Sequence, residues 1–232
     1  IRYLHRSCLH RYPQRVEPLV VKLSGTQKFL YSAYLKTVCI VLGRFYFCMA
    51  KILWYGDAVS HTGFARVTHS LLEHLSKNHE VVVFGINYNG DPHQYDFKIY
   101  PAAGVHPGDR FGLARLPSVV EEEKPDFIIA VNDIWMINQV WEKIHFLQPT
   151  LGFKFIPYFP IDSERYVDSM LRYVQDWDFS VTFTVQQAQR IQNHNVQPKM
   201  LGVLPHGIDA EKFFPMDQEE ARRKLSLPAG KF

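Results

Sequence analysis

The sequence predicts an α/β fold, a Rossmann-like doubly wound parallel sheet. From Lys51 onward, short apolar runs alternate with amphipathic stretches of helical length, which indicates βαβ units with right-handed crossovers. The 232 residues are 47% hydrophobic and 21% charged. This is enough apolar material for the core of one domain and too little for two large domains.

The expected strands are short apolar runs, and the expected helices carry apolar residues three and four positions apart. In the helix expected at 64–77, Phe64, Val67 and Leu71 lie on one face. The last helix begins with acids and ends with bases, as the helix dipole favours. The strands are expected at 51–55, 80–85, 97–100, 126–131, 153–159, 179–185 and 200–204. The helices are expected at 64–77, 112–124, 134–145, 165–174, 186–193 and 217–225.

Charge and cysteine are both unevenly distributed. Residues 1–48 hold eight of the 26 basic residues and one of the 23 acids, which leaves 18 basic and 22 acidic residues from Met49 onward. This slightly acidic body offers no basic face for nucleic acid. All three cysteines (Cys8, Cys39 and Cys48) precede Met49. The body therefore excludes disulfide scaffolds and thiol catalysis, and we expect a reducing, cytoplasmic location.

Residues 1–48 look foreign to the fold. The apolar run 29–48 is interrupted by Lys36 and Arg44, which suits neither a membrane-spanning helix nor a signal peptide. We favour Met49 as the true start, with 1–48 a translated upstream sequence or a poorly ordered extension. A membrane-proximal anchor is the competing interpretation.

Four loops are expected to carry ligand contacts, because ligands of such sheets bind beyond the carboxyl ends of the strands. The first loop, GDAVSHTG at 56–63, precedes a helix N-terminus suited to phosphate, although a plain turn capped by Thr62 or Ser60 is an equal alternative. The other loops, at 131–135, 158–162 and 204–209, each follow a later strand. Their non-functional alternatives are helix capping by Asp133, a turn at Asp162 and a structural role for His206. The candidate substrate-binding residues are Gly56, Thr62, Gly63, Asn132, Asp133, Asp162, His206 and Gly207.

The motifs of several other site classes are missing from the sequence. It contains no G-x-G-x-x-G and no P-loop, and no H-x-H, H-E-x-x-H or C-x-x-C pair. We therefore expect no metal and no tightly bound cofactor.

The segment VLPHGIDAEKFFP at 203–215 resembles the P-x-G-[IV]-D-x-x-x-F-x-P segment of the retaining group 1 glycosyltransferases of GT-B type. The loops at 56–63, 132–133 and 158–162 follow in that family's order. The resemblance implies that 49–205 is the Rossmann-like acceptor-side domain, and that 206–232 is the linker and the start of a donor domain that is otherwise missing. The family's Arg/Lys pair and E-x7-E motif would lie in that donor domain, so no catalytic centre is complete in this chain.

The resemblance implies a transferase that moves a sugar from a nucleotide-sugar donor to a glycan, lipid or small-molecule hydroxyl acceptor. It also allows peripheral membrane contact. Asn132 departs from the family pattern, since many members have a histidine there and an amide cannot take a proton. The first loop also lacks the family's paired glycines. The alternatives are a non-catalytic Rossmann-like module that binds a nucleotide or carbohydrate, and a two-domain sugar-nucleotide epimerase.

Overall fold

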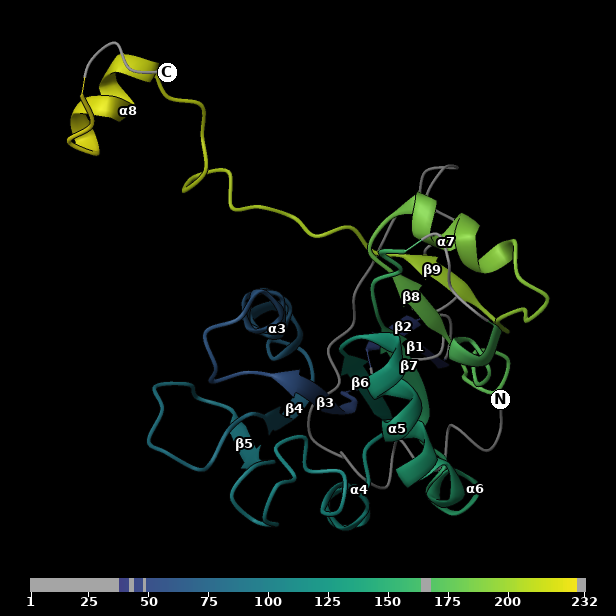
Figure 1. Cartoon of the computed structure of the whole chain (residues 1–232). Coiled ribbons are helices and arrows are strands. Elements are labelled where there is room, and N and C mark those ends of the chain that lie inside the picture. Colours follow the sequence, from purple (N-terminus) through teal and green to yellow (C-terminus); the bar gives the residue numbers. More distant parts are fainter. Residues whose placement is uncertain (1–37, 42–43, 48, 164–167, 229–232) are drawn as a thin grey trace.

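The computed structural model describes residues 38–41, 44–47, 49–163 and 168–228 (Figure 1). Within residues 1–48, β1 (Val38–Val41) and β2 (Arg44–Phe47) pair antiparallel as a small sheet of their own. The rest of the expected extension, including Lys36, lies outside the described residues.

The body is built on a seven-stranded parallel sheet, which confirms the predicted fold class. The strand order is β5-β4-β3-β6-β7-β8-β9, the order of a Rossmann-like sheet with one further strand. The chain therefore first builds outward from β3 to β5, then returns to the other side of β3 with β6. The strands are β3 (Lys51–Asp57), β4 (Glu80–Ile86), β5 (Lys98–Pro101), β6 (Phe127–Val131), β7 (Lys154–Tyr158), β8 (Ser180–Thr182) and β9 (Leu201–Val203).

Helices cover both faces of this sheet. α4 (Leu116–Glu123), α5 (Ile134–Ile144) and α7 (Val185–Gln192) contribute to the larger apolar cluster, on the face of Leu53 and Tyr55. α3 (Gly63–Leu75) packs on the opposite face, where Trp54 Nε1 donates to Thr68 Oγ1 at 3.1 Å. α5 continues through the 3₁₀ turn η1 (His145–Leu147) into α6 (Gln148–Leu151). Successive side chains of β3 thus point alternately into two apolar cores, one on each face of the sheet.

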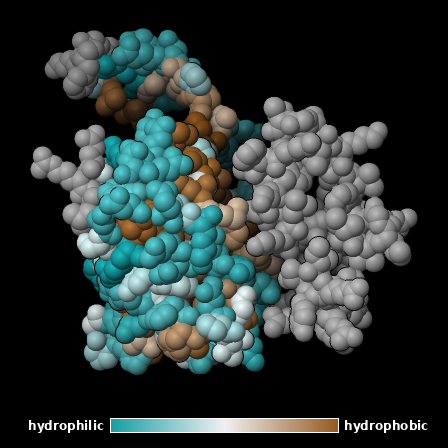
Figure 2. All heavy atoms as spheres, turned by 90° about the vertical axis from the view of Figure 1, so that its right-hand side faces the viewer, coloured by the Kyte–Doolittle hydropathy of each residue, from teal (hydrophilic) through white to brown (hydrophobic). Residues whose placement is uncertain are grey.

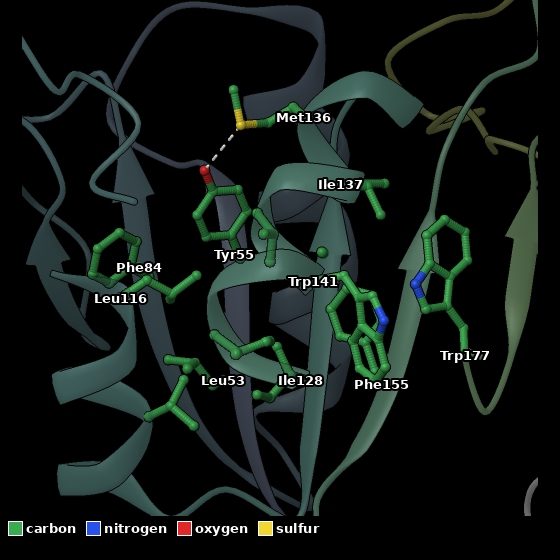
Figure 3. Close-up of a cluster of buried hydrophobic side chains, with 14 of the residues drawn as sticks. Leu53, Tyr55, Phe84, Leu116, Ile128, Met136, Ile137, Trp141, Phe155 and Trp177 are labelled. Carbon is green, nitrogen blue, oxygen red and sulfur yellow. Dashed lines mark hydrogen bonds between the residues drawn. The ribbon is translucent and has the colours of Figure 1, made fainter. Parts of the chain in front are cut away.

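The larger core is rich in aromatic rings (Figure 3). Trp141 of α5 lies 5.1 Å from the ring of Phe155 on β7, and Trp177 lies 6.0 Å from the same ring. Tyr55 is fully buried beneath α5, and its hydroxyl points toward Met136 (Figure 3). Burial raises the pKa of Tyr55, so the ring remains a neutral part of the core.

The sequence prediction failed clearly at one element. A helix was expected over 165–174, but the described part of that range holds only the 3₁₀ turn η2 (Asp168–Met170) followed by turns. Leu171 and Val174 are fully buried, and Asn138 Nδ2 of α5 donates to Met170 O at 3.0 Å. The apolar spacing that suggests a helix thus serves to anchor irregular chain to the core, since tertiary contacts override local propensity.

α4 begins later than expected, at Leu116 instead of residue 112. Gly112 has φ 68°, a left-handed conformation that ends regular structure before it, and Pro117 occupies the first helical turn, where its missing N–H costs nothing. A Cβ on Gly112 would come within 2.6 Å of two ring carbons of Phe84, so this tight turn requires glycine.

A charge cluster occupies the amino edge of the sheet. The Glu123 side chain is 6% exposed and pairs with Lys51 at the start of β3 and Lys98 at the start of β5. Tyr100 Oη also donates to Glu123, at 2.6 Å. Burial disfavours the ionised Glu123, but the hydrogen bonds from these three groups outweigh it and lower the pKa to about 2. The cluster ties α4 to β3 and β5.

The pairing between β7 and β8 is short. Tyr158 and Val181 are the pair in register there, and Phe159 N donates to Val181 O at 3.0 Å. Trp177 packs beside this junction, 5.8 Å from the ring of Phe159. Side-chain packing therefore holds β8 and β9 to the sheet as much as the backbone ladder does.

After β9 the chain leaves the domain as an arm, residues 204–228, that ends in α8 (Gln218–Lys224) away from the sheet (Figure 1). The arm exposes many large apolar side chains, and hydrophobic atoms are visible on it and below it in Figure 2. These side chains are those of Leu204, Ile208, Phe213, Phe214, Met216, Leu225 and Leu227.

Candidate functional site

The most suitable place for a ligand is the carboxyl edge of the sheet between β3 and β6. In the sheet order, β4 and β5 lie on one side of β3 while β6 to β9 lie on the other. The connections leave β3 and β6 in different directions at such a switch point, which opens a crevice at the strand ends. Of the predicted residues, Gly56, Thr62, Gly63, Asn132 and Asp133 flank this point.

Gly56 allows the two strands to lie close together at this edge. A Cβ at this position would lie 3.2 Å from the Val131 carbonyl oxygen and 3.3 Å from Trp54 Nε1. Its role is therefore close packing of β3 against β6, and a ligand contact by its backbone is an untested prediction.

The carboxylate of Asp57 organises the first loop. It ends β3, is 5% exposed, and accepts hydrogen bonds from Ser60 Oγ at 2.9 Å and Thr62 Oγ1 at 2.8 Å. Asn87 Nδ2, from the loop after β4, donates to the same carboxylate at 3.1 Å. Asn87 has φ 55°, a left-handed conformation that asparagine tolerates better than most residues. Asp57 thus joins the loops that follow β3 and β4.

Thr62 and Gly63 form the start of α3. Thr62 is the N-cap, and its Oγ1 accepts from Ala65 N at 3.1 Å, which settles the capping residue in favour of Thr62 over Ser60. Nothing lies within 4 Å of a Cβ built on Gly63. The first turn carries no acid, so its amides and the positive end of the helix dipole could receive an anion.

Asn132 and Asp133 follow β6, across the switch point from Gly56. Asn132 is 6% exposed, and its Oδ1 accepts from Asp133 N at 2.8 Å. Asp133 is the N-cap residue of α5, yet its side chain makes no capping hydrogen bond. Its Oδ2 lies 3.4 Å from Trp135 Nε1 instead. The backbone carbonyl of Asp133 accepts from Ile137 N at the start of α5, while its carboxylate is left to Trp135.

The other predicted residues lie farther along the same edge. Asp162 follows β7 and is exposed, while His206 and Gly207 follow β9. The His206 ring lies 4.2 Å from that of Phe183 and 5.7 Å from that of Tyr158. Tyr158 Oη donates to Leu204 O at 2.6 Å, which fixes the base of the arm, and partial burial lowers the pKa of His206. The histidine therefore lies against Phe183 at the root of the arm.

Sequence reasoning missed two features of the site. Asp57 lies inside the first predicted loop but was not singled out, although a carboxylate that ends an apolar strand beside a glycine could have signalled it. Trp135 is 44% exposed at the start of α5, and Phe111 packs against it edge-on at 5.8 Å. No sequence signal joins residues 111 and 135, since their contact depends on the tertiary fold.

The described part of the chain has neither a metal-binding cluster nor a membrane-spanning helix. It holds no group of three or more His, Cys, Asp or Glu residues arranged to bind a metal ion. Within the same residues, no helix is long and apolar enough to span a bilayer.

Comparisons with known proteins identify no family. No protein-family model matches the chain, and a search of curated proteins finds no match either.

Proposed function

We propose that this chain is the acceptor-side domain of a retaining glycosyltransferase, which transfers a sugar from a nucleotide-sugar donor to a hydroxyl acceptor. One observation carries the proposal. The motif-bearing segment 203–215 leaves the last strand at the same carboxyl edge as the loops of Asp57 and Asn132. A connector to a donor domain would have to leave from that edge, because the acceptor and donor must meet there.

The groups at the edge suit the chemistry of sugar transfer. A departing nucleoside diphosphate needs compensation of its charge, which the N-terminus of α3 beside Thr62 and Gly63 could provide in part. Asp133 and Asp162 are carboxylates that could accept hydrogen bonds from sugar hydroxyls. Asn132 takes no proton and would serve in binding alone. The cationic groups that complete the reaction are expected in the donor domain.

The proposal is tested on the polypeptide that the gene encodes. We would read the coding sequence on both sides of these 232 codons, express the encoded protein, and measure nucleoside diphosphate release from a panel of nucleotide sugars with and without acceptors. Acceptor-dependent release with retained anomeric configuration supports the proposal. Ligand binding without turnover supports the non-catalytic binding module instead.

A pair of variants links turnover to the proposed edge. Asp133→Ala should lower kcat/KM about tenfold or more, the cost of one hydrogen bond to a charged group. Phe146→Ala is the control, because Phe146 is 58% exposed in η1, beyond the far end of α5 and toward the amino edge. Equal losses in both variants would contradict the proposed location of the site.

A further inference from the structure

Trp135 is the exposed tryptophan of this chain. Its side chain is 44% exposed, whereas Trp54, Trp141 and Trp177 are 1%, 5% and 0% exposed. It lies in the first turn of α5, two residues after Asp133 at the switch point. A ligand that covers this exposed indole would gain the free energy of burying its apolar surface.

The indole is held in place at two points. Phe111 packs against it at 5.8 Å with an interplanar angle of 87°, an edge-to-face contact. Its Nε1 donates to Asp133 Oδ2, 3.4 Å away. A ring already fixed in position loses little conformational freedom when a ligand binds, so its contact area contributes more to affinity. We name Phe111 and Trp135 the aromatic platform.

The Phe111 side of the platform is anchored to the sheet. Tyr55 Oη donates to Phe111 O at 3.0 Å from inside the core. Asn87 N donates to Arg110 O, also at 3.0 Å. On the other side of Phe111, the tight turn at Gly112 packs against Phe84. Three consecutive residues are thus tied to β3, β4 and the loop organised by Asp57, which makes the platform part of the rigid edge.

We propose that the aromatic platform is a carbohydrate subsite, in which the apolar face of a pyranose ring stacks on Trp135 and a sugar hydroxyl donates to the Asp133 carboxylate. This inference rests on the proposed function and names its acceptor as a glycan. The C–H groups of a pyranose face pack against an indole, while its equatorial hydroxyls need acceptors at the ring edge. Trp135 with Asp133 beside it supplies both.

The charges favour a neutral sugar over the nucleotide part of the donor. A nucleobase would also stack on an indole, but its phosphates would approach the Asp133 carboxylate beside the ring. The Arg110 guanidinium lies over the other ring, with its carbon 4.9 Å from the Phe111 centroid. It therefore occupies a face of Phe111 and leaves Trp135 as the stacking surface.

The exposed indole provides its own assay. Iodide quenches tryptophan fluorescence by collision, so Trp135 should dominate the quenching of the full 232-residue chain because the other three indoles are at most 5% exposed. We would titrate the chain with cellobiose, maltose and N,N′-diacetylchitobiose, and with uridine and adenosine diphosphates, and measure the iodide quenching slope. A disaccharide that stacks on Trp135 should reduce this slope about twofold, since bound ligands cover most of their contact surface.

Three variants separate the subsite from indirect effects. Trp135→Phe should remove most of the quenching. Asp133→Asn should weaken the apparent affinity for the protecting disaccharide about tenfold, with the quenching slope of the variant without sugar as its own reference. Phe146→Ala, which removes an exposed aromatic ring in η1 beyond the opposite end of α5, should change neither quantity. Far-UV circular dichroism would show that each variant is folded.

The proposal is overturned if no disaccharide protects Trp135, or if the nucleotides protect it and the sugars do not. It is also overturned if Asp133→Asn binds the disaccharide as tightly as the unmodified chain does. These results are independent of the transfer assay. Protection without transfer would support the carbohydrate subsite and contradict the proposed transferase activity. Transfer without protection would support the transferase activity and contradict the subsite.

Discussion

Glu123 is the charge on which the amino edge of the sheet depends, and replacing it by glutamine should destabilise the fold. Its pKa is lowered from 4.5 to about 2, which corresponds to about 3 kcal/mol of stabilisation of the ionised form at neutral pH. The side chain is 6% exposed, so solvent screens it little, although its partner Lys98 is 54% exposed and contributes less.

We expect Glu123→Gln to lose about 2–3 kcal/mol of unfolding free energy at pH 7. Glutamine keeps the volume and part of the hydrogen bonding, while Lys51 keeps its second partner, Glu80, at 2.9 Å. Urea denaturation followed by circular dichroism measures this loss. Glu122→Gln is the control, because that neighbouring side chain is 62% exposed and should change stability by less than about 0.5 kcal/mol.

The pH dependence provides a second test of the same reasoning. The folded-state pKa of Glu123 is lower than the unfolded one, so its contribution is fully present above about pH 4.5 and is lost as the pH falls toward 2. The unmodified chain should therefore lose stability over this interval more steeply than Glu123→Gln does. Equal slopes, or a loss at pH 7 no larger than that of Glu122→Gln, would refute the reasoning.

Three further perturbations test other parts of the structure. Gly112→Ala should lower the free energy of unfolding by about 2–4 kcal/mol, measured by thermal unfolding, because of left-handed backbone strain and the collision with Phe84. Gly152→Ala is the control and should lose only about 1 kcal/mol, because its Cβ would meet no atom within 4 Å. Asp57→Ala should cost about 2–3 kcal/mol because it strands three donors; a smaller loss than that of Thr62→Ala would count against its organising role. The exposed arm should make the chain self-associate in sedimentation velocity, and Phe213→Ser, at a side chain that is 63% exposed, should reduce this; a monodisperse unmodified monomer would contradict it.

The sequence was sufficient to predict the sheet because its strands have a local signal. Each of the seven described strands of the parallel sheet overlaps a predicted one, since buried parallel strands are continuous apolar runs such as that of β4. The helix expected over 165–174 was wrong in its described part, because apolar residues at helical spacing also suit turns that are anchored to a core.

The candidate site was less predictable than the fold. The sequence identified loops that the topology brings to one edge, with Gly56 and Asn132 on adjacent strands. It did not identify Asp57 as the organiser of the first loop, nor the contact between Phe111 and Trp135, because both depend on partners from separate βα units. What the edge binds stays a prediction for these experiments.

The narrow junction between β7 and β8 has a consequence for how the molecule opens. With one residue pair in register, the unit of β8, α7 and β9 is joined to the rest by few backbone hydrogen bonds. Trp177 packs across the junction, and the Asp178 carboxylate accepts hydrogen bonds from Lys154 and Gln148 beside it. Such a unit can unfold as a cooperative block at lower free energy than the whole domain. Amide hydrogens of β8 and β9 should then exchange with solvent sooner than those of β3 and β6. Release of the arm together with that block would require breaking the hydrogen bond from Tyr158 of β7 to Leu204 O at the root of the arm.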